Sequence, residues 1–306
     1  MTGLRRRRIA NYRRLIHLLN QRYHQEFIRA ERLSADAALI QKLRATWLFR
    51  VLRWIKRFRR KSPIDAAFAP IELKPAEVRG RVSIIIPFKD RGELLRGCLA
   101  SLRLSTYRRF ETILVDNGSS EPALLRLLER LEQRKRDRVV RDPSPFNFSR
   151  LCNAGAAAAR GDWLLFLNND TCVLTPDWLE QMILAASQPG VGITGAALFY
   201  PDGTVQHAGM FQRGDGVWEH LGHGQTTIGS EVRSVPAVSA ACLLIGRELF
   251  EELGGFDETR PVTHNDVDLC RRVRACGRLI ALTPHARLLH YESLSRGYTP
   301  TPPDRE

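Results

Sequence analysis

The segment Leu164–Leu167 is followed directly by Asn168-Asn169-Asp170-Thr171, and this abrupt change constrains the fold more than any other feature of the chain. Four consecutive apolar residues predict a strand buried on both faces, as in a parallel sheet. In open α/β sheets, ligands bind beyond the carboxyl ends of the strands. An Asp at such an end, flanked by amides and a hydroxyl, suits Mg²⁺ or Mn²⁺. The alternative is an Asx-turn that only ends the strand.

Strands and helices alternate from Arg81 to about Pro300, which is typical of an α/β layer fold. The apolar runs predict strands at Val82–Ile86, Glu111–Val115, Trp163–Leu167, Val191–Leu198 and Ala237–Ile245. Helical spacing predicts helices over residues 94–102, 121–134, 150–160, 176–186, 247–253 and 266–276. We expect Gly161 to stop the third helix, and Thr175-Pro176 to cap the fourth.

Charge divides the chain unevenly. Residues 1–61 hold 18 of the 47 Lys and Arg residues but only three of the 33 acidic ones, a net charge of +15. The remainder has a net charge of −1, so no nucleic-acid partner is expected for the body of the protein. Residues 62–80 contain three prolines and little periodicity. We therefore predict a basic helical extension at 1–61, a linker at 62–80 and one domain at 81–300.

The segment 47–61 has a basic amphipathic pattern. On a helical wheel, one arc holds Trp47, Leu48, Val51, Leu52, Trp54, Ile55 and Phe58. The opposite arc holds Arg50, Arg53, Lys56, Arg57, Arg60 and Lys61. Such a helix can adsorb to an anionic membrane surface. A helix docked on its own domain or on a partner is an equal alternative, and a nucleic-acid arm is disfavoured by the apolar arc.

Six cysteines without a CxxC pair, and an N-terminus without the apolar core of a signal peptide, indicate a reducing compartment. The longest apolar run, Ala237–Ile245, is far shorter than the roughly 20 residues that cross a bilayer. We therefore expect a cytoplasmic protein, peripheral at the inner face of the cell membrane if 47–61 adsorbs there.

Asp116 follows the predicted strand Glu111–Val115, so Asp116 and Asp170 lie after different strands at one edge of the same sheet. One acid at such an edge can hold the base or ribose of a nucleotide, while another reaches a metal on its phosphates. Asp116-Asn117-Gly118 is also a strong turn sequence, and a plain turn is the alternative for Asp116.

Two further acids, Asp266 and Asp268, open the last predicted helix. Positions i and i+2 do not share a helical face. One carboxylate can therefore point into a cleft while the other caps the helix or pairs with an Arg.

Seven short motifs occur in a characteristic order and spacing between about residues 81 and 297. They are Val82-Ser-Ile-Ile-Ile-Pro87, Val115-Asp-Asn-Gly-Ser119, Phe146-Asn-Phe-Ser149, Leu167-Asn-Asn-Asp-Thr171, Gly254-Gly-Phe-Asp257, Asn265-Asp-Val-Asp-Leu-Cys270 and His290-Tyr-Glu-Ser-Leu-Ser-Arg-Gly297. Each motif alone is weak, but the ordered set resembles the family 2 glycosyltransferases, including rhamnosyltransferase-like enzymes of cell-surface polysaccharides. The resemblance implies the GT-A fold, a mostly parallel mixed sheet flanked by helices, and an inverting, metal-dependent sugar transfer.

For the nucleotide, the resemblance assigns four positions. Pro87 and the residues after it, including Asp90, would line the base. Asp116 looks like the acid that holds the base or ribose, and Asn153 resembles a position beside the nucleotide. The implied donor is a UDP-, dTDP- or GDP-sugar.

The metal and the base are assigned in the same way. Asp170 occupies the last place of the family's DxD motif and would bind Mg²⁺ or Mn²⁺, while Asn168 and Asn169 complete the motif on the donor side. His290 resembles the late histidine that approaches the metal or diphosphate. Asp266 matches the general base.

The acceptor side is less specified. The Gly-rich segment 206–225 is long for a simple connection, and long loops in compact domains are often functional. Trp218, Glu219 and His220 in this loop, with Asp268, are candidate acceptor residues. A Trp that covers the edge of the core is an equal alternative to one that stacks on a sugar.

These residue types fit a single displacement. The acceptor hydroxyl needs a carboxylate base, and a divalent cation neutralises the departing diphosphate. The chain lacks the Gln-x-x-Arg-Trp motif of processive synthases, which favours addition of one sugar per encounter to a glycan or lipid-linked glycan. The alternatives are a nucleotidyltransferase, which should show a Gly-rich phosphate loop, and a non-catalytic membrane-associated scaffold.

Overall fold

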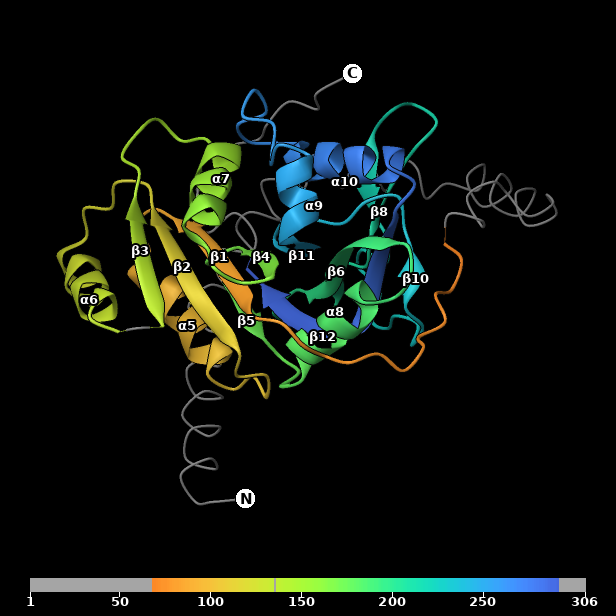
Figure 1. Cartoon of the computed structure of the whole chain (residues 1–306), viewed down its shortest axis with the longest axis horizontal. Helices are drawn as coiled ribbons and strands as arrows, with labels where there is room; N and C mark the ends of the chain where they lie inside the picture. The colour runs from red at the N-terminus through yellow and green to blue at the C-terminus, as the bar shows by residue number, and fades with distance from the viewer. Residues whose placement is uncertain (1–67, 135, 292–306) are drawn as a thin grey trace, which may run out of the picture. The chain divides into compact units, whose positions relative to one another are not determined.

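The structure is a computed structural model that describes residues 68–134 and 136–291. The chain divides into two compact units, Met1–Ala69 and Pro70–Glu306. The predicted extension 1–61, with its amphipathic segment 47–61, lies outside the described residues. The second unit contains the central sheet, whose main path has the strand order β10-β12-β6-β11-β4-β1-β2-β3 (Figure 1).

One half of the sheet is parallel. β1 (Val82–Phe88) lies between β2 (Phe110–Asp116) and β4 (Trp163–Leu167), and β3 (Asp137–Arg141) extends the sheet beyond β2. β1 and β2 are buried along their whole length, as expected for strands covered on both faces. Their carboxyl ends meet at one edge of the sheet, where Phe88 is paired in register with Asp116. The strand predicted at Trp163–Leu167 is confirmed.

The other half is mixed. β11 (Cys242–Gly246) runs antiparallel to both β4 and β6 (Val191–Phe199), while β12 (Leu279–His290) runs parallel to β6. Near its end β12 also pairs with the short β5 (Thr171–Val173), so that His290 lies opposite Thr171. β7 (Val205–His207) pairs with β6, and β10 (Arg233–Ser234) forms the edge beside β12. A separate hairpin joins β8 (Met210–Gln212) to β9 (Trp218–His220).

Helices cover both faces of the sheet (Figure 1). α5 (Gly92–Leu102), α6 (Pro122–Glu132) and α8 (Trp178–Ala186) share one large apolar core with β1, where Leu95, Leu128 and Trp178 are buried. α7 (Phe148–Ala158), α9 (Arg247–Glu252) and α10 (Asn265–Ala275) lie on the other face. α7 packs closely on β1 and β2 because Gly155 has no side chain. A Cβ at this position would collide with Ile85 and Val115.

Two sequence-based expectations about helix ends are wrong. α7 ends at Ala158, and Gly161 is not its stop: a side chain at Gly161 would collide with the backbone of Arg81 and Ser83 in the neighbouring strand. α8 begins at Trp178 rather than after a Thr175 cap, because the Thr175 hydroxyl donates 3.0 Å to the carbonyl of His285 instead. Tertiary contacts have overridden the local signals in both cases.

The described part of the predicted linker is attached to the domain. Ile71 donates 2.8 Å to the carbonyl of Val232, and Lys74 donates 2.9 Å to the side chain of Gln188. Ile71 and Leu73 pack on a small apolar cluster. In the part of the chain that is described, no helix is both long enough and apolar enough to cross a membrane.

Candidate active site

A cleft of about 530 Å³ opens at the carboxyl ends of β1 and β4. Its lining is Pro87, Phe88, Lys89, Asp90, Arg91, Phe146, Phe148, Asn168, Asn169 and Val262. The lining thus includes four residues that the sequence predicted, Pro87, Asp90, Asn168 and Asn169, and its volume lies in the range of small-molecule sites. Their donor-binding role stays a prediction.

The loop after β1 has an uncommon backbone. Asp90 and Arg91 have φ values of 50° and 53°, in the left-handed region that non-glycine residues rarely adopt. Asp90 Oδ1 accepts hydrogen bonds from the backbone N–H groups of Ser120 (2.6 Å) and Glu121 (3.0 Å). These bonds join the β1–α5 loop to the loop that follows Asp116. Such strain persists where surrounding contacts fix it, and it clusters at binding sites.

Asn169 presents an unsatisfied donor in the cleft. It is 3% exposed, and its Nδ2 has no hydrogen-bond partner among the described residues. A buried amide without a partner costs about 1–3 kcal/mol. A ligand that supplies an oxygen acceptor in the cleft would remove this penalty.

Asp170 and His290 meet beside the cleft. Asp170 Oδ1 lies 3.3 Å from His290 Nε2, because both residues lie at the same end of the β5–β12 pairing, where His290 is opposite Thr171. Both side chains are buried, and His290 Nε2 also lies 3.3 Å from Asn168 Nδ2. The chain therefore brings together the carboxylate and imidazole that the sequence predicted for a metal, while their role as ligands stays a prediction.

His290 has a second polar partner that sequence reasoning missed. Its Nδ1 lies 2.7 Å from Oε1 of Gln206, a buried residue of β7. No local pattern marks this glutamine, because its partner lies 84 positions further along the chain.

Asp266 lies in the first turn of α10, where His264 precedes the helix in the left-handed conformation, φ 59°. Its Oδ2 accepts 3.1 Å from the backbone N–H of Ala240, and the next residue, Ala241, accepts 3.1 Å from the N–H of Asn168. The loop that contains Ala240 and Ala241 thus connects Asp266, the candidate base, with the Asn168–Asp170 segment, which carries the candidate metal ligand. The role of Asp266 as a base stays a prediction.

Asp268 points to a different environment, as its spacing from Asp266 predicted. Its Oδ2 lies 2.8 Å from Arg272 Nε, and Arg272 also donates to the carbonyls of Leu253 and Gly255. These bonds hold α10 against the turn after α9. These contacts indicate a structural function for Asp268. None of them supports the prediction that Asp268 binds the sugar acceptor.

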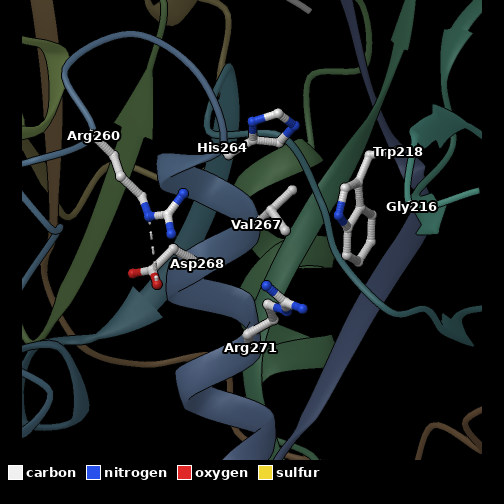
Figure 2. Close-up of a pocket in the computed structure, with 7 residues that line it drawn as sticks. All are labelled: Gly216, Trp218, Arg260, His264, Val267, Asp268 and Arg271. Carbon is white, nitrogen blue, oxygen red and sulfur yellow. Dashed lines mark ion pairs between the residues drawn. The ribbon is translucent and has the colours of Figure 1, made fainter. Parts of the chain in front are cut away.

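Trp218 lies against α10 (Figure 2). A cavity of about 10 Å³ is lined by Gly216, Trp218, Arg260, His264, Val267, Asp268 and Arg271. This volume holds about one water molecule and no sugar. The arrangement favours the alternative in which Trp218 covers the edge of the core. The neighbouring candidates have internal partners: Glu219 pairs with Arg213 at 2.7 Å, and His220 Nδ1 lies 3.2 Å from His207 Nδ1.

Asp116 and Asn153 are not among the residues that line the cleft, although Asp116 is paired in the sheet with the lining residue Phe88. Asp116 is 3% exposed, and its Oδ1 accepts 2.9 Å from the N–H of Ser119, which is the turn geometry considered for this motif. The Asn153 amide bonds the backbone N–H and carbonyl of Phe256, both at 2.9 Å, and Glu258. The Asn153 side chain thus attaches residues 256–258 to α7. Contact with a nucleotide stays a prediction for both Asp116 and Asn153.

Several cleft residues were not predicted as site residues. Phe146 and Phe148 belong to a recognised motif without an assigned role, and Val262 lies outside the motifs, whereas Phe88, Lys89 and Arg91 belong to the stretch after Pro87 that was expected to line the base. Phe146 and Val262 are about two-fifths exposed, at 40% and 39%, which is unusual for large apolar side chains. The only sequence signal for Phe146 and Phe148 was their place in a recognised motif.

The family model of glycosyl transferase family 2 matches residues 83–254, more than half of the chain. The chain belongs to this family. The match begins in β1 and ends after α9, so it includes every residue that lines the cleft except Val262, and it includes Asp170 but not Asp266 or His290.

Curated relatives agree with the family. The chain is 43% identical over 246 residues to the uncharacterized protein y4gI of Sinorhizobium fredii, and 40% identical over 245 residues to the O-antigen biosynthesis protein RfbC of Myxococcus xanthus. These matches cover 76% and 74% of this chain, but only 27% and 19% of the relatives. The N-acetylglucosaminyl-diphospho-decaprenol L-rhamnosyltransferase of Mycobacterium tuberculosis is 28% identical over 235 residues, covering 68% of this chain and 75% of that enzyme.

Solved structures share the fold. A crystal structure of GalNAc-T7 with UDP, GalNAc and Mn²⁺ superposes with a TM-score of 0.61 at 20% identity, covering 69% of this chain and 43% of that one. The mannosyltransferase PcManGT of Pyrobaculum calidifontis, in complex with GDP-Man and Mn²⁺, gives 0.55 at 18% identity, covering 82% and 65%. The GT-A fold expected from the sequence is confirmed.

Proposed function

We propose that this glycosyltransferase moves one sugar, with inversion, from a UDP-, dTDP- or GDP-sugar to a hydroxyl of a glycan or lipid-linked glycan of the bacterial cell surface. The donor would occupy the cleft at the ends of β1 and β4, and Mg²⁺ or Mn²⁺ would bind beside it. The names of RfbC and the rhamnosyltransferase support the cell-surface acceptor.

The observation that carries this proposal is that Asp266 and Asn168 are both hydrogen-bonded to the loop that contains Ala240 and Ala241. Ala240 donates to the carboxylate of Asp266, and Ala241 accepts from the backbone of Asn168, which begins the Asn168–Asp170 segment. The proposed base and the segment that carries the proposed metal ligand are thus bonded to neighbouring residues of one loop, and a cleft of about 530 Å³ lies at the carboxyl ends of β1 and β4.

The side chains present fit a divalent cation. Two ligands at right angles on an octahedral Mg²⁺ lie about 3.0 Å apart, and the Asp170 and His290 atoms are separated by 3.3 Å. Within residues 68–134 and 136–291, no group of three or more His, Cys, Asp or Glu side chains can hold a metal. Mg²⁺ is usually held by one or two carboxylates with substrate phosphates and water, so we expect tight binding only when the nucleotide is present.

Each of these residues would have a separate role in a single displacement. Asp266 would accept the proton of the acceptor hydroxyl as that oxygen attacks the anomeric carbon. A cation at Asp170 and His290 would neutralise the charge that develops on the diphosphate. Asn169 would donate its buried amide N–H to the donor. Because the displacement is direct, no covalent enzyme intermediate forms and the anomeric centre inverts.

A donor panel tests the proposal. UDP-, dTDP- and GDP-sugars are incubated with the chain and Mn²⁺, and nucleotide release is followed with and without EDTA. We expect EDTA and Asp170→Ala each to lower release by at least about 100-fold. Asp177→Ala, an exposed acid at the start of α8, is the matched control. Release that ignores EDTA and survives Asp170→Ala would remove the metal from the mechanism.

We further propose that the segment 47–61 adsorbs to anionic membrane and brings the enzyme to a lipid-linked acceptor at the inner face of the cell membrane. Its basic and apolar arcs support this location. Flotation with phosphatidylglycerol liposomes compares the full chain with a chain lacking residues 1–61. Equal flotation of the two would rule out this membrane contact.

A further inference from the structure

The hydrogen-bond partners of His290 determine which of its ring nitrogens carries the proton. Gln206 Oε1, which can only accept, lies 2.7 Å from Nδ1. Asn168 Nδ2, which can only donate, lies 3.3 Å from Nε2. Both contacts are satisfied together when Nδ1 carries the hydrogen and Nε2 keeps its lone pair.

This tautomer directs a lone pair towards a carboxylate. Nε2 lies 3.3 Å from Oδ1 of Asp170, and Asp170 is 2% exposed. Two electron-rich atoms at this separation repel each other unless a cation lies between them. The other tautomer would place a hydrogen between them and convert the pair into an ordinary hydrogen bond that no metal could enter without displacing it.

We propose that Gln206 is a positioning residue for a divalent cation: it holds His290 as the Nδ1-protonated tautomer and so keeps Nε2 available beside Asp170. The inference rests on the proposed metal dependence and adds a residue outside the recognised motifs. Metal-binding histidines commonly donate their second ring N–H to an acceptor that fixes the ring. Gln206 is 3% exposed, so water does not easily replace it in this role.

The tautomer can be measured in the unaltered chain. Long-range ¹H–¹⁵N correlation spectra of metal-free, ¹⁵N-histidine-labelled protein distinguish the two neutral forms, and His290→Gln identifies the signal among the eight histidines. We expect protonated Nδ1. A protonated Nε2 in the wild-type chain would overturn the inference, and this measurement does not depend on whether any Gln206 variant folds.

Metal affinity gives the second readout. Free Mn²⁺ is measured by electron paramagnetic resonance with UDP, dTDP or GDP present, comparing wild type with Gln206→Met and Gln206→Glu. We expect a 10–100-fold weaker affinity for Gln206→Met, because second partners of metal ligands typically contribute that much. Gln206→Glu keeps an acceptor and should bind Mn²⁺ as wild type does. Wild-type affinity in a folded Gln206→Met would overturn the inference.

Gln188→Met is the matched control, because Gln188 is also buried, 4% exposed, and bonds the carbonyls of Lys74 and Leu184 instead. We expect it to bind Mn²⁺ like the wild type. An equal loss in both variants would mean that removing any buried glutamine weakens the site, and would refute a specific role for Gln206. If the wild type binds no Mn²⁺ with any nucleotide, the proposed metal dependence itself fails, whichever tautomer the spectra show.

Discussion

The carboxylates of Asp90 and Glu121 each accept hydrogen bonds from the backbone at the entry to the helix that the other one precedes. Asp90 Oδ1 accepts from the backbone of Ser120 and Glu121 at the start of α6. The Glu121 carboxylate accepts from Arg91 at 2.8 Å and Gly92 at 3.0 Å, at the start of α5. Four hydrogen bonds therefore join the loops at the ends of β1 and β2, and Asp90 and Arg91 of the first loop line the cleft.

This reciprocal capping predicts coupled losses of stability. Asp90→Ala and Glu121→Ala should each lower the free energy of unfolding by about 1–2 kcal/mol, since each leaves two backbone N–H groups at or just before the start of a helix without their acceptor. Their double variant should lose less than the sum, because the two caps hold the same pair of loops. Urea unfolding measures these values, with the exposed Glu129→Ala as a control near zero. Strict additivity would contradict the coupling.

Asp266→Asn should separate binding from chemistry. The amide still offers an oxygen to the N–H of Ala240 but cannot accept a proton, so transfer should fall at least about 100-fold. Donor affinity, measured by calorimetry with the nucleotide and Mn²⁺, should stay close to that of the wild type. Asp268→Asn is the comparison, because it weakens the contact with Arg272 and should lower stability while transfer per folded molecule persists. Loss of donor binding in Asp266→Asn would place the base elsewhere.

Asn153→Ala should destabilise the protein before it affects the nucleotide. It removes both partners of the Phe256 backbone, and we expect the free energy of unfolding to fall by about 2–4 kcal/mol. Asn147→Ala removes the cap of α7 and one exposed hydrogen bond to the carbonyl of Glu258, and we expect it to lower the free energy of unfolding less, by about 1–2 kcal/mol. Thermal unfolding compares the two. A variant of Asn153 that is as stable as wild type yet binds the donor poorly would instead indicate direct nucleotide contact.

The stability of the fold should decrease in mild acid because of His207. Burial, with the neighbouring His220 and His290, lowers the pKa of His207 well below its ordinary value near 6.5. Below about pH 6.5, His207 binds a proton in the unfolded chain but not in the folded chain. The contribution of neutral, buried His207 to the free energy of unfolding is therefore fully present above about pH 6.5 and is lost as the pH falls. Urea midpoints between pH 8 and 5 should show this slope, and His207→Gln should flatten it. The exposed His285→Gln should leave it intact; an unchanged slope in His207→Gln would assign it to other groups.

Thiol chemistry should report the native fold. Cys276 is exposed and the other five cysteines are buried. Burial raises the pKa of the Cys98 thiol to about 12, so little reactive thiolate forms there at pH 8. Titration with a disulfide reagent should give one rapidly reacting thiol in buffer and all six in denaturant, and Cys276→Ser should remove the rapid phase. Several rapid thiols in buffer would show that the core opens readily.

The strands that surround the cleft were predictable because each is a short apolar run with a clear polar end. Val82–Phe88 is buried along its whole length and Trp163–Leu167 at every residue after Trp163, which is what a continuous apolar run predicts. β12 was missed, although it is 12 residues long, because its pairing with β6 has a register shift between Thr283 and Arg287. A run interrupted in this way has no clean period of two. The predicted strand from Ala237 shortened to Cys242–Gly246 because residues before it form the loop that bonds Asp266.

Side-chain partnerships were harder to predict than elements. The motif order located Asp170 and His290, but the tertiary partners of Asp90, Asn153 and Gln206 depend on pairs separated by 30 to more than 100 positions. Nothing in the local sequence of Gln206 distinguishes it from a solvated residue. Positive φ angles at Asp90 and Arg91 are likewise imposed by the contacts of Glu121 and Ser119, not by their own preferences.

The position of His290 at the end of β12 has a consequence for biosynthesis. The cleft is complete once Val262 has been made, and the Asn168–Asp170 segment is present much earlier, but the imidazole comes from the last described strand. A nascent chain released before β12 would also leave β6 without its parallel neighbour. Truncated products of this gene should therefore be unable to hold the cation that sugar transfer is proposed to require, so incomplete synthesis would yield inert protein rather than an uncontrolled hydrolase of sugar nucleotides.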